Sequence, residues 1–385
     1  MPADAIRLVA VLGDPSAARG LDGSEWSELV AAARAANLLG TLAERLKDAG
    51  ISADRHADRH LEGSRQLGMR QRRSVLWEAH CLQAALGDLQ VPIVLLKGAA
   101  YVLSGHTASQ GRLFGDIDIL VPRSELGAVE SRLMLSGWVG VKTHAYDQRY
   151  YREWMHELPP LVHLRRGTVL DVHHTIVPLT ARHAPDPQRI IERAMPLPEL
   201  PALRVPCPED LLIHSITHLV HEGELHNGLR DLNDIDGMVR SFGRLPGFWE
   251  RLTRYASGND LAGPVCFGLH LAHRFYASPV PDAVLAGLSP TGLPAQSACW
   301  LEAVYARAIG LHGGRHNAAV KTLAEWLISA RAHALRMPLH LLVWHLGRKA
   351  LMRSMKIADG PETGAGPNPG DDPGSARHMR ARPPG

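Results

Sequence analysis

The chain of 385 residues is longer than one ordinary domain, and its 45% hydrophobic content is enough to build apolar cores in two or three structural units. A net charge of +3 suits an anionic substrate but is far below the basicity of a dedicated nucleic-acid binder. The four scattered cysteines form no C-x-x-C pair, which argues against a zinc ribbon or a disulfide framework and favours a cytoplasmic location.

Residues 1–88 are predicted to form an N-terminal helical segment. The first residues lack the basic and apolar runs of a signal peptide. Between Ser24 and Leu86, apolar residues recur three and four positions apart, which is typical of amphipathic helices. Several arginines between Arg65 and Arg73 could contact phosphate, but such runs usually form the solvated side of a helix.

A different pattern begins at Val91, inside a predicted core of residues 89–180. The run VPIVLL is typical of a buried strand, and a short helix is expected from Ala99. DIDILV, from Asp116, alternates acidic and aliphatic residues and predicts a strand with two different faces. A further helix up to Gly137 and a β-hairpin with arms 161–164 and 169–176 complete the mixed α/β unit.

Proline-dense sequence places a domain boundary near residue 200, and residues 200–355 are predicted to form a C-terminal helical domain. Its last helix, from Pro338, begins with an apolar run too short to span a bilayer. We expect this helix to dock on the domain, with an acidic membrane surface as the alternative. Residues 356–385 are rich in proline and glycine, and we expect them to be disordered.

The sharpest chemical feature is the acid-x-acid pattern of Asp116 and Asp118. Two carboxylates placed two residues apart on a strand point to the same face. They repel each other unless a cation lies between them, and Mg²⁺ prefers such oxygen ligands. An adjacent antiparallel strand could bring Asp171 of LDVHH beside the pair, which would suit a two-metal phosphoryl-transfer site. A solvated strand face is the alternative interpretation of the pair.

Upstream of the acids, Lys97 and Gly98 lie between a predicted strand and a predicted helix. Backbone N–H groups at a helix start attract phosphate, and the lysine adds a positive charge at that point. Glycine is common at such junctions, so this signal gains weight only beside the acids.

Taken together, these motifs resemble the nucleotidyltransferase superfamily with a DNA polymerase β-like core, and in particular the bacterial group of uncharacterised nucleotidyltransferases. The resemblance covers roughly residues 25–280 and implies an α+β fold in which a mixed sheet lies between the N-terminal helical segment and the C-terminal helical domain. The matching stretches are LLKGAA from Leu95, RLFGDIDILV from Arg112, LDVHH from Leu170, PEDLLIHSITHLV from Pro208 and LRDLNDI from Leu229.

The resemblance implies transfer of a nucleoside monophosphate from a nucleoside triphosphate, with Mg²⁺ or Mn²⁺ as the cofactor. Asp116 and Asp118 would be metal ligands, and Asp171 a third ligand or the base for the acceptor. Lys97, Gly98 and Arg112 would bind the triphosphate. Ala99 departs from the superfamily pattern, which usually has a small hydroxyl residue after the glycine.

Five further residues are candidates for supporting roles. His173 shares a strand face with Asp171 and could orient a metal-bound carboxylate, or it could be a structural histidine. His214 and His218 lie four apart on a predicted helix but lack the glutamate of a zinc protease, so we expect them to line the acceptor site or to be structural. Arg230 and Asp231 could contact the nucleotide or brace the helical domain.

Two functional hypotheses follow. The first is an active transferase that acts on an unidentified small molecule, sugar, peptide or protein, by analogy in natural-product or polysaccharide biosynthesis. The second is a non-catalytic nucleotide-binding or regulatory module that keeps the fold. A nucleic-acid partner ranks below these acceptors because aromatic residues make up only 5% of the chain.

Overall fold

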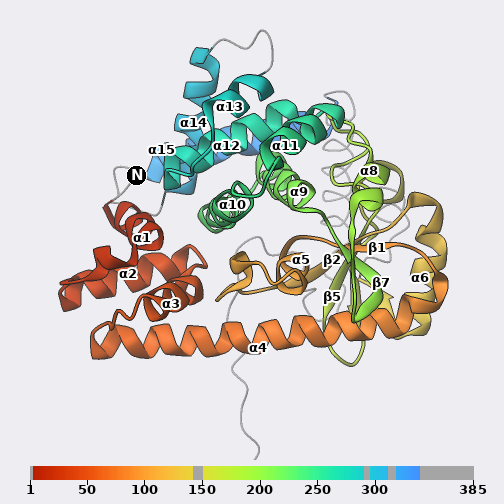
Figure 1. Cartoon of the computed structure of the whole chain (residues 1–385), viewed down its shortest axis with the longest axis horizontal. Helices are drawn as coiled ribbons and strands as arrows, with labels where there is room; N and C mark the ends of the chain where they lie inside the picture. Colours follow the sequence, from red (N-terminus) through yellow and green to blue (C-terminus); the bar gives the residue numbers. More distant parts are fainter. Residues whose placement is uncertain (1–2, 142–150, 290–294, 311–317, 339–385) are drawn as a thin grey trace, which may run out of the picture. The chain divides into compact units, whose positions relative to one another are not determined.

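A seven-stranded mixed sheet lies in the middle of the described chain (Figure 1). The computed structural model describes residues 3–141, 151–289, 295–310 and 318–338. The strand order is β3-β4-β5-β2-β1-β7-β6, which places the acid-bearing strand β2 at the centre. The strands are β1 Ile93–Leu95, β2 Asp116–Leu120, β3 Trp138–Gly140, β4 Leu161–His163, β5 Val169–His173, β6 Met195–Leu197 and β7 Leu200–Val205. The predicted α+β class with a mixed sheet is confirmed.

The strand that carries Asp171 runs parallel to β2, so the expected antiparallel pairing is wrong. β4 and β5 form the predicted hairpin, but its second arm, β5, joins β2, while β4 pairs with β3 on the outer side. The consequence for the acids is the same. Asp118 lies directly opposite Asp171 in the register, and residues opposite each other share a face of the sheet.

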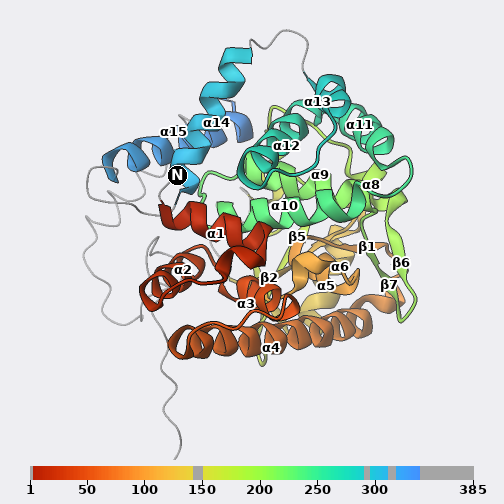
Figure 2. The same cartoon turned by 60° about the vertical axis from the view of Figure 1, so that its left-hand side comes forward.

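One long helix joins the N-terminal helices to the sheet (Figure 2). α4 contacts α2 and α3 along one part of its length and α5, α6 and β7 along another. Asp54 caps its first turn by accepting hydrogen bonds from the His56 and Ala57 backbone N–H groups. The helices of this part are α1 Ala3–Gly13, η1 Pro15–Ala18, α2 Gly23–Ala35, α3 Leu39–Asp48, α4 Arg55–Leu86 and η2 Gly87–Leu89.

The loop before β2, which contains Gly111, lies in close backbone contact with both α3 and α4. An ideal Cβ on Gly40 of α3 would lie 2.2 Å from the Gly111 carbonyl oxygen, and one on Gly68 of α4 would lie 3.2 Å from its Cα. Only glycine permits such close backbone contact. The core helices are α5 Lys97–Leu103, η3 Thr107–Ser109, η4 Arg123–Glu125 and α6 Leu126–Leu135.

The predicted connector around residue 200 contributes structure of its own. It holds α8 and the β6–β7 hairpin, and β7 pairs parallel with β1. After it, α9 is buried along most of its length against α10, α11, α12 and α15. The helices are α8 Pro187–Arg193, α9 Pro208–His221, α10 Gly228–Phe242, α11 Phe248–Gly258, α12 Ala262–Tyr276, α13 Asp282–Leu288, α14 Ala295–Ile309 and α15 Ala318–Arg336.

Residues Met1–Pro338 form one compact unit. Beyond Pro338, the helix predicted to run to about residue 355 and the tail at 356–385 fall outside the described residues. Among the helices that the structure describes, none combines the length and the apolar character needed to cross a membrane.

Candidate active site

Three carboxylates converge where β2 and β5 lie side by side. Asp116 and Asp118 project from the same face of β2 because the alternation places Ile117 on the other, buried face. Asp171 lies opposite Asp118 on β5. One carboxylate oxygen from each of the three acids lies within 4.8 Å of the others. The structure therefore brings together the three acids that the sequence predicted as a metal site.

Asp118 is held by hydrogen bonds from two side chains, those of Lys97 and His173. Its side chain is 3% exposed, and its Oδ1 accepts a hydrogen bond from Lys97 Nζ at 2.7 Å and one from His173 Nε2 at 2.9 Å. Burial by itself raises the pKa of Asp118, but Lys97 and His173 outweigh burial and hold that pKa well below its usual range. Asp118 is therefore ionised at neutral pH. Both contacts involve Oδ1, which leaves Oδ2 for another cation.

The other two acids lack such compensation. Burial and the nearby carboxylates of Glu157 and Asp118 raise the pKa of Asp171 to about 7. Its Oδ1 is buried and has no hydrogen-bond partner among the described residues. The pocket wall, which partly withdraws Asp116 from water, and the nearby Asp118 carboxylate also raise the pKa of Asp116. A cation near these carboxylates would relieve the repulsion between them.

Lys97 reaches Asp118 from an unusual turn of the backbone. Its φ of +43° lies in the left-handed region, which a residue with a side chain seldom adopts. The turn places its ammonium group at the acids rather than along α5, and Asp118 raises the pKa of Lys97 even though burial opposes this. Gly98 follows because an ideal Cβ there would lie 2.5 Å from the Phe114 ring.

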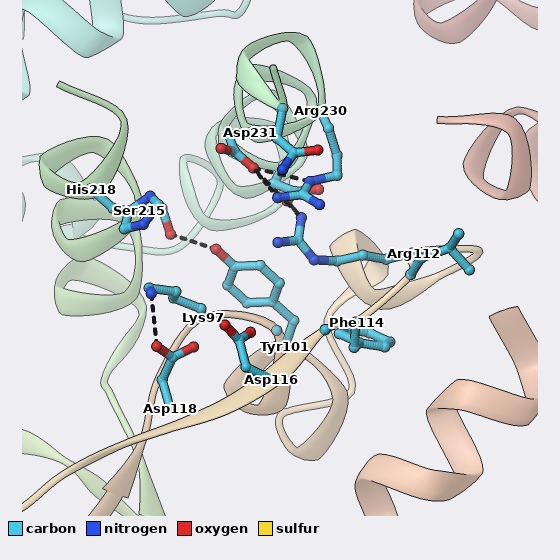
Figure 3. A pocket seen from close by; sticks show the side chains of 15 residues that line it. Lys97, Tyr101, Arg112, Phe114, Asp116, Asp118, Ser215, His218, Arg230 and Asp231 are labelled. Atoms are coloured by element: carbon cyan, nitrogen blue, oxygen red, sulfur yellow. Dashed lines mark hydrogen bonds and ion pairs between the residues drawn. The ribbon is translucent and has the colours of Figure 1, made fainter. Parts of the chain in front are cut away.

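Asp116 and Asp118 line a polar pocket of about 270 Å³ (Figure 3), whereas Asp171 is not among the residues that line it. Asp116, Asp118 and Lys97 lie at one end, and Arg112, Arg230 and Asp231 lie at the other. Between them, the Tyr101 and Ser215 hydroxyl groups form a hydrogen bond of 2.7 Å. The pocket thus takes residues from β2, α5, the loop before β2, α9 and α10.

Arg112 is in the pocket wall, but its charge is already balanced. Its side chain is 9% exposed and forms an ion pair with Asp234, and Asp231 lies 4.0 Å away. Asp231 also accepts a hydrogen bond from its neighbour Arg230 at 2.9 Å. Arg112 therefore links the loop before β2 to α10.

The two helix histidines differ in position. His214 is 3% exposed, and burial together with Lys97 and His173 lowers its pKa to about 3, so it is neutral. His218 lies one turn further along α9, lines the pocket and is 3.6 Å from Glu222. The structure therefore brings His218, but not His214, to the pocket wall.

A second group of metal-binding side chains adjoins the acids. His156, Glu157 and His173 have ligand atoms within 4.8 Å of one another. His173 Nε2 lies 3.5 Å from Glu157 Oε2 as well as 2.9 Å from Asp118 Oδ1. His173 therefore connects the two groups and, together with Lys97, holds the Asp118 carboxylate in place.

Sequence reasoning missed several residues of this site. Asp234 had a signal, because its position three residues after Asp231 places both on one face of a helix. Tyr101 and Phe114 had no signal beyond their apolar character. Glu157 lies before β4, where no periodic pattern indicates the position of its side chain.

A family model described as "Uncharacterised nucleotidyltransferase" matches residues 22–277 of this chain, which is more than half of its length. The chain belongs to this family. The resemblance found in the sequence motifs is thereby confirmed, and the matched range includes α4, the whole sheet and α9 to α12. Asp116, Asp118 and Asp171 thus all lie within the part of the chain that matches this nucleotidyltransferase family.

Other comparisons add little. The crystal structure of an antigenic nucleotidyltransferase-like protein from Paracoccidioides brasiliensis is similar at 16% identity, over 52% of this chain and 91% of that one. Its TM-score is 0.27, too low to support an argument about fold or function. A comparison with curated proteins gave no match.

Proposed function

We propose that this protein transfers a nucleoside monophosphate from a nucleoside triphosphate to an acceptor, with Mg²⁺ or Mn²⁺ held by Asp116, Asp118 and Asp171. The observation that carries the proposal is the convergence of these three carboxylates within 4.8 Å in a chain that belongs to a nucleotidyltransferase family. Three carboxylates are what a two-metal phosphoryl-transfer site requires.

The donor set fits a hard divalent cation. All three ligands are carboxylate oxygens, and one of them, Asp171 Oδ1, is buried without a partner. When bound, such ions neutralise charge on the phosphates and assist loss of the proton from the acceptor.

The charges of the pocket support dependence on metal. Its wall contains three cationic side chains and four carboxylates, and so carries a net negative charge before any ion binds. A triphosphate, which is strongly anionic, would be repelled by such a wall. We therefore propose that the donor binds together with its metal ions and very weakly without them.

The residues around the acids have separate proposed roles. Lys97 and His173 orient Asp118, and the Lys97 ammonium group faces the space where phosphates would lie. Arg230 lines the far end of the pocket, where it would bind the donor with Asp231 as its brace. Arg112 lines the same pocket, and its ion pair with Asp234 joins the loop before β2 to α10. Because Asp234 neutralises this guanidinium group, we propose that Arg112 attracts the triphosphate less strongly than Arg230 does.

The acceptor is proposed to be a small molecule, sugar, peptide or protein, and a role in natural-product or polysaccharide biosynthesis stays an analogy. We propose that His218, which lines the pocket, contacts the acceptor. A cytoplasmic location is part of the proposal and is supported by four free cysteines.

The test is calorimetric binding of each nucleoside triphosphate with Mg²⁺ or Mn²⁺. Asp116→Asn is the first variant because Asp116 is exposed, so its replacement should leave the fold intact. Asp48→Asn, at an exposed position outside the pocket, is the matched control. We expect metal-dependent binding by the native chain and the control, and its loss in Asp116→Asn.

Absence of metal-dependent binding in the folded native chain would overturn the proposal. Where binding is found, release of pyrophosphate on addition of hydroxyl-bearing acceptors separates transfer from binding alone. Binding with no release across such acceptors would favour the non-catalytic module.

A further inference from the structure

A second cavity, of about 390 Å³, lies where α1, α3, η3 and α10 meet. It shares no lining residue with the pocket of Asp116 and Asp118. The polar groups in its wall are those of Arg45, Thr107, Asp236, Arg240, Ser241 and Arg244. Three guanidinium groups thus surround a cavity that contains one carboxylate.

The single carboxylate is already fully used. Asp236 is 2% exposed and accepts hydrogen bonds from Arg240 Nε at 2.9 Å and from Ser278 Oγ at 2.7 Å. Arg240 also donates to the Tyr276 carbonyl at 2.7 Å. Asp236 and Arg240 therefore neutralise each other, and the charges of Arg45 and Arg244 are left over.

Arg45 gives the stronger indication of an anion site, because it is partly buried whereas Arg244 is exposed. Its guanidinium group donates to the Leu12 carbonyl oxygen and forms no ion pair with any carboxylate that the structure describes. Burial lowers the pKa of Arg45 and outweighs the opposing effects of Tyr276 and Asp236, and Arg240 adds a smaller lowering effect. A cation withdrawn from water without a counterion is costly, and an anion in the cavity would remove that cost.

A smaller adjoining cavity of about 90 Å³ shares Arg45, Thr107 and Gly237 with the first. Its wall includes one carboxylate, that of Glu44, and Asn233, whose Oδ1 is buried and has no partner in the described part of the chain. An unpaired acceptor of this kind calls for a hydrogen-bond donor on the ligand.

We propose that this cavity binds a small phosphate ester that also carries a hydroxyl group. The phosphate would lie between Arg45 and Arg244, because two uncompensated guanidinium groups match a dianion better than they match a carboxylate. The hydroxyl would donate to Asn233 Oδ1. This site is separate from the pocket proposed for the donor and the acceptor, since the two share no lining residue.

The position of the cavity links it to the active site through two elements. η3 leads directly into the loop of Arg112, and its preceding residue His106 forms a 2.7 Å hydrogen bond with Ser241 of α10. α10 carries Asp236 and Arg240 at the cavity and Asp231 at the active-site pocket. A bound ligand would therefore fasten α3 to α10 behind the pocket.

Binding is tested with inorganic phosphate and glycerol phosphate in EDTA, by calorimetry and by thermal unfolding of the full chain. The chelator keeps metal-dependent binding at the acids out of the measurement. We expect saturable binding by the native chain and by Asp116→Asn, with glycerol phosphate the tighter ligand. Both phosphates should raise the melting temperature of the native chain, whereas sodium chloride at equal ionic strength should not.

Arg244→Gln decides the question, because Arg244 is exposed and its replacement should not disturb folding. We expect Kd to rise at least about tenfold in this variant. Arg59→Gln removes the same charge from an exposed position on α4 and should bind like the native chain. Arg45→Met should weaken binding further.

Equal binding by Arg244→Gln and Arg59→Gln would overturn the site, as would the absence of saturable binding by the native chain. Equal affinities for the two phosphates would overturn the role given to Asn233. Failure of metal-dependent nucleotide binding, by contrast, concerns the three acids and leaves this proposal standing.

Discussion

Replacing Gly40 with alanine is expected to destabilise the protein, whereas the same replacement at Gly63 should stabilise it. Both glycines are helical, in α3 and α4. An ideal Cβ at Gly63 has no atom within 4 Å, so alanine there gains only its better helix propensity, about 0.5–1 kcal/mol. At Gly40 the Cβ would lie 2.2 Å from a backbone oxygen of Gly111.

The clash at Gly40 is with backbone on both sides, so no side chain can rotate to relieve it. Overpacking of this kind costs about 1–3 kcal/mol, and the gain in helix propensity offsets only part of it. Because both variants gain the same helix propensity, we expect their free energies of unfolding to differ by the overpacking cost, about 1–3 kcal/mol. Gly68→Ala, with its nearest contact at 3.2 Å, should fall between them.

Urea denaturation followed by circular dichroism measures these differences, provided that the slopes of the three transitions agree. If Gly40→Ala were as stable as Gly63→Ala, α3 and the loop before Arg112 would not be in close contact. The close contact between Gly40 and Gly111 would then be refuted.

Three further predictions concern other parts of the chain. Asp210 is 1% exposed and accepts two hydrogen bonds of 2.8 Å from Arg193. Asp210→Asn removes the charge of this buried pair, and we expect urea denaturation to show a loss of about 3 kcal/mol in the free energy of unfolding. The control Asp88→Asn, at an exposed ion pair, should lose less than about 0.5 kcal/mol. Burial lowers the pKa of His106 to about 4. Between about pH 6.5 and about pH 4, the unfolded chain binds a proton at His106 that the folded chain does not. The contribution of His106 to the free energy of unfolding should therefore fall by about 1.4 kcal/mol per pH unit as the pH drops from about 6.5 to 4, and titration of His106→Asn should show a shallower fall in total stability. Mn²⁺ should raise the melting temperature of the native chain but not of Asp116→Asn, and EDTA should reverse the rise; an equal rise in both proteins would contradict metal binding at Asp116.

The sequence was most informative where chemistry and local pattern coincide. Asp116, Ile117 and Asp118 fix which side chains face the pocket, because strand alternation needs no knowledge of the rest of the chain. The hairpin that carries Asp171 was also predictable from its turn and its apolar arms. The direction in which it joins β2 was not, because that depends on which arm the outer strand β3 pairs with.

Contacts between distant parts of the chain were the other gap. Arg112 and Asp234 are 122 positions apart, and no local pattern connects a loop before a strand with a helix of the next segment. β7 was hidden for a different reason. Its sequence LPALRV lies among prolines, which indicate a connector, yet a proline can be accommodated near the start of a strand.

The contacts of α4 and β7 with the rest of the sheet limit which fragment of the chain could fold around the three acids. A fragment of residues 89–180 would leave β1 without its neighbour β7 and would remove the helix that lies against α5, α6 and β7. Apolar residues that are now covered would then face water, with an unpaired strand beside them, and such an edge promotes aggregation. We expect the smallest fragment that keeps the three acids in place to run from about the start of α4 to the end of β7. Exchange of acceptor specificity between relatives should therefore graft the flanking helices onto that whole unit.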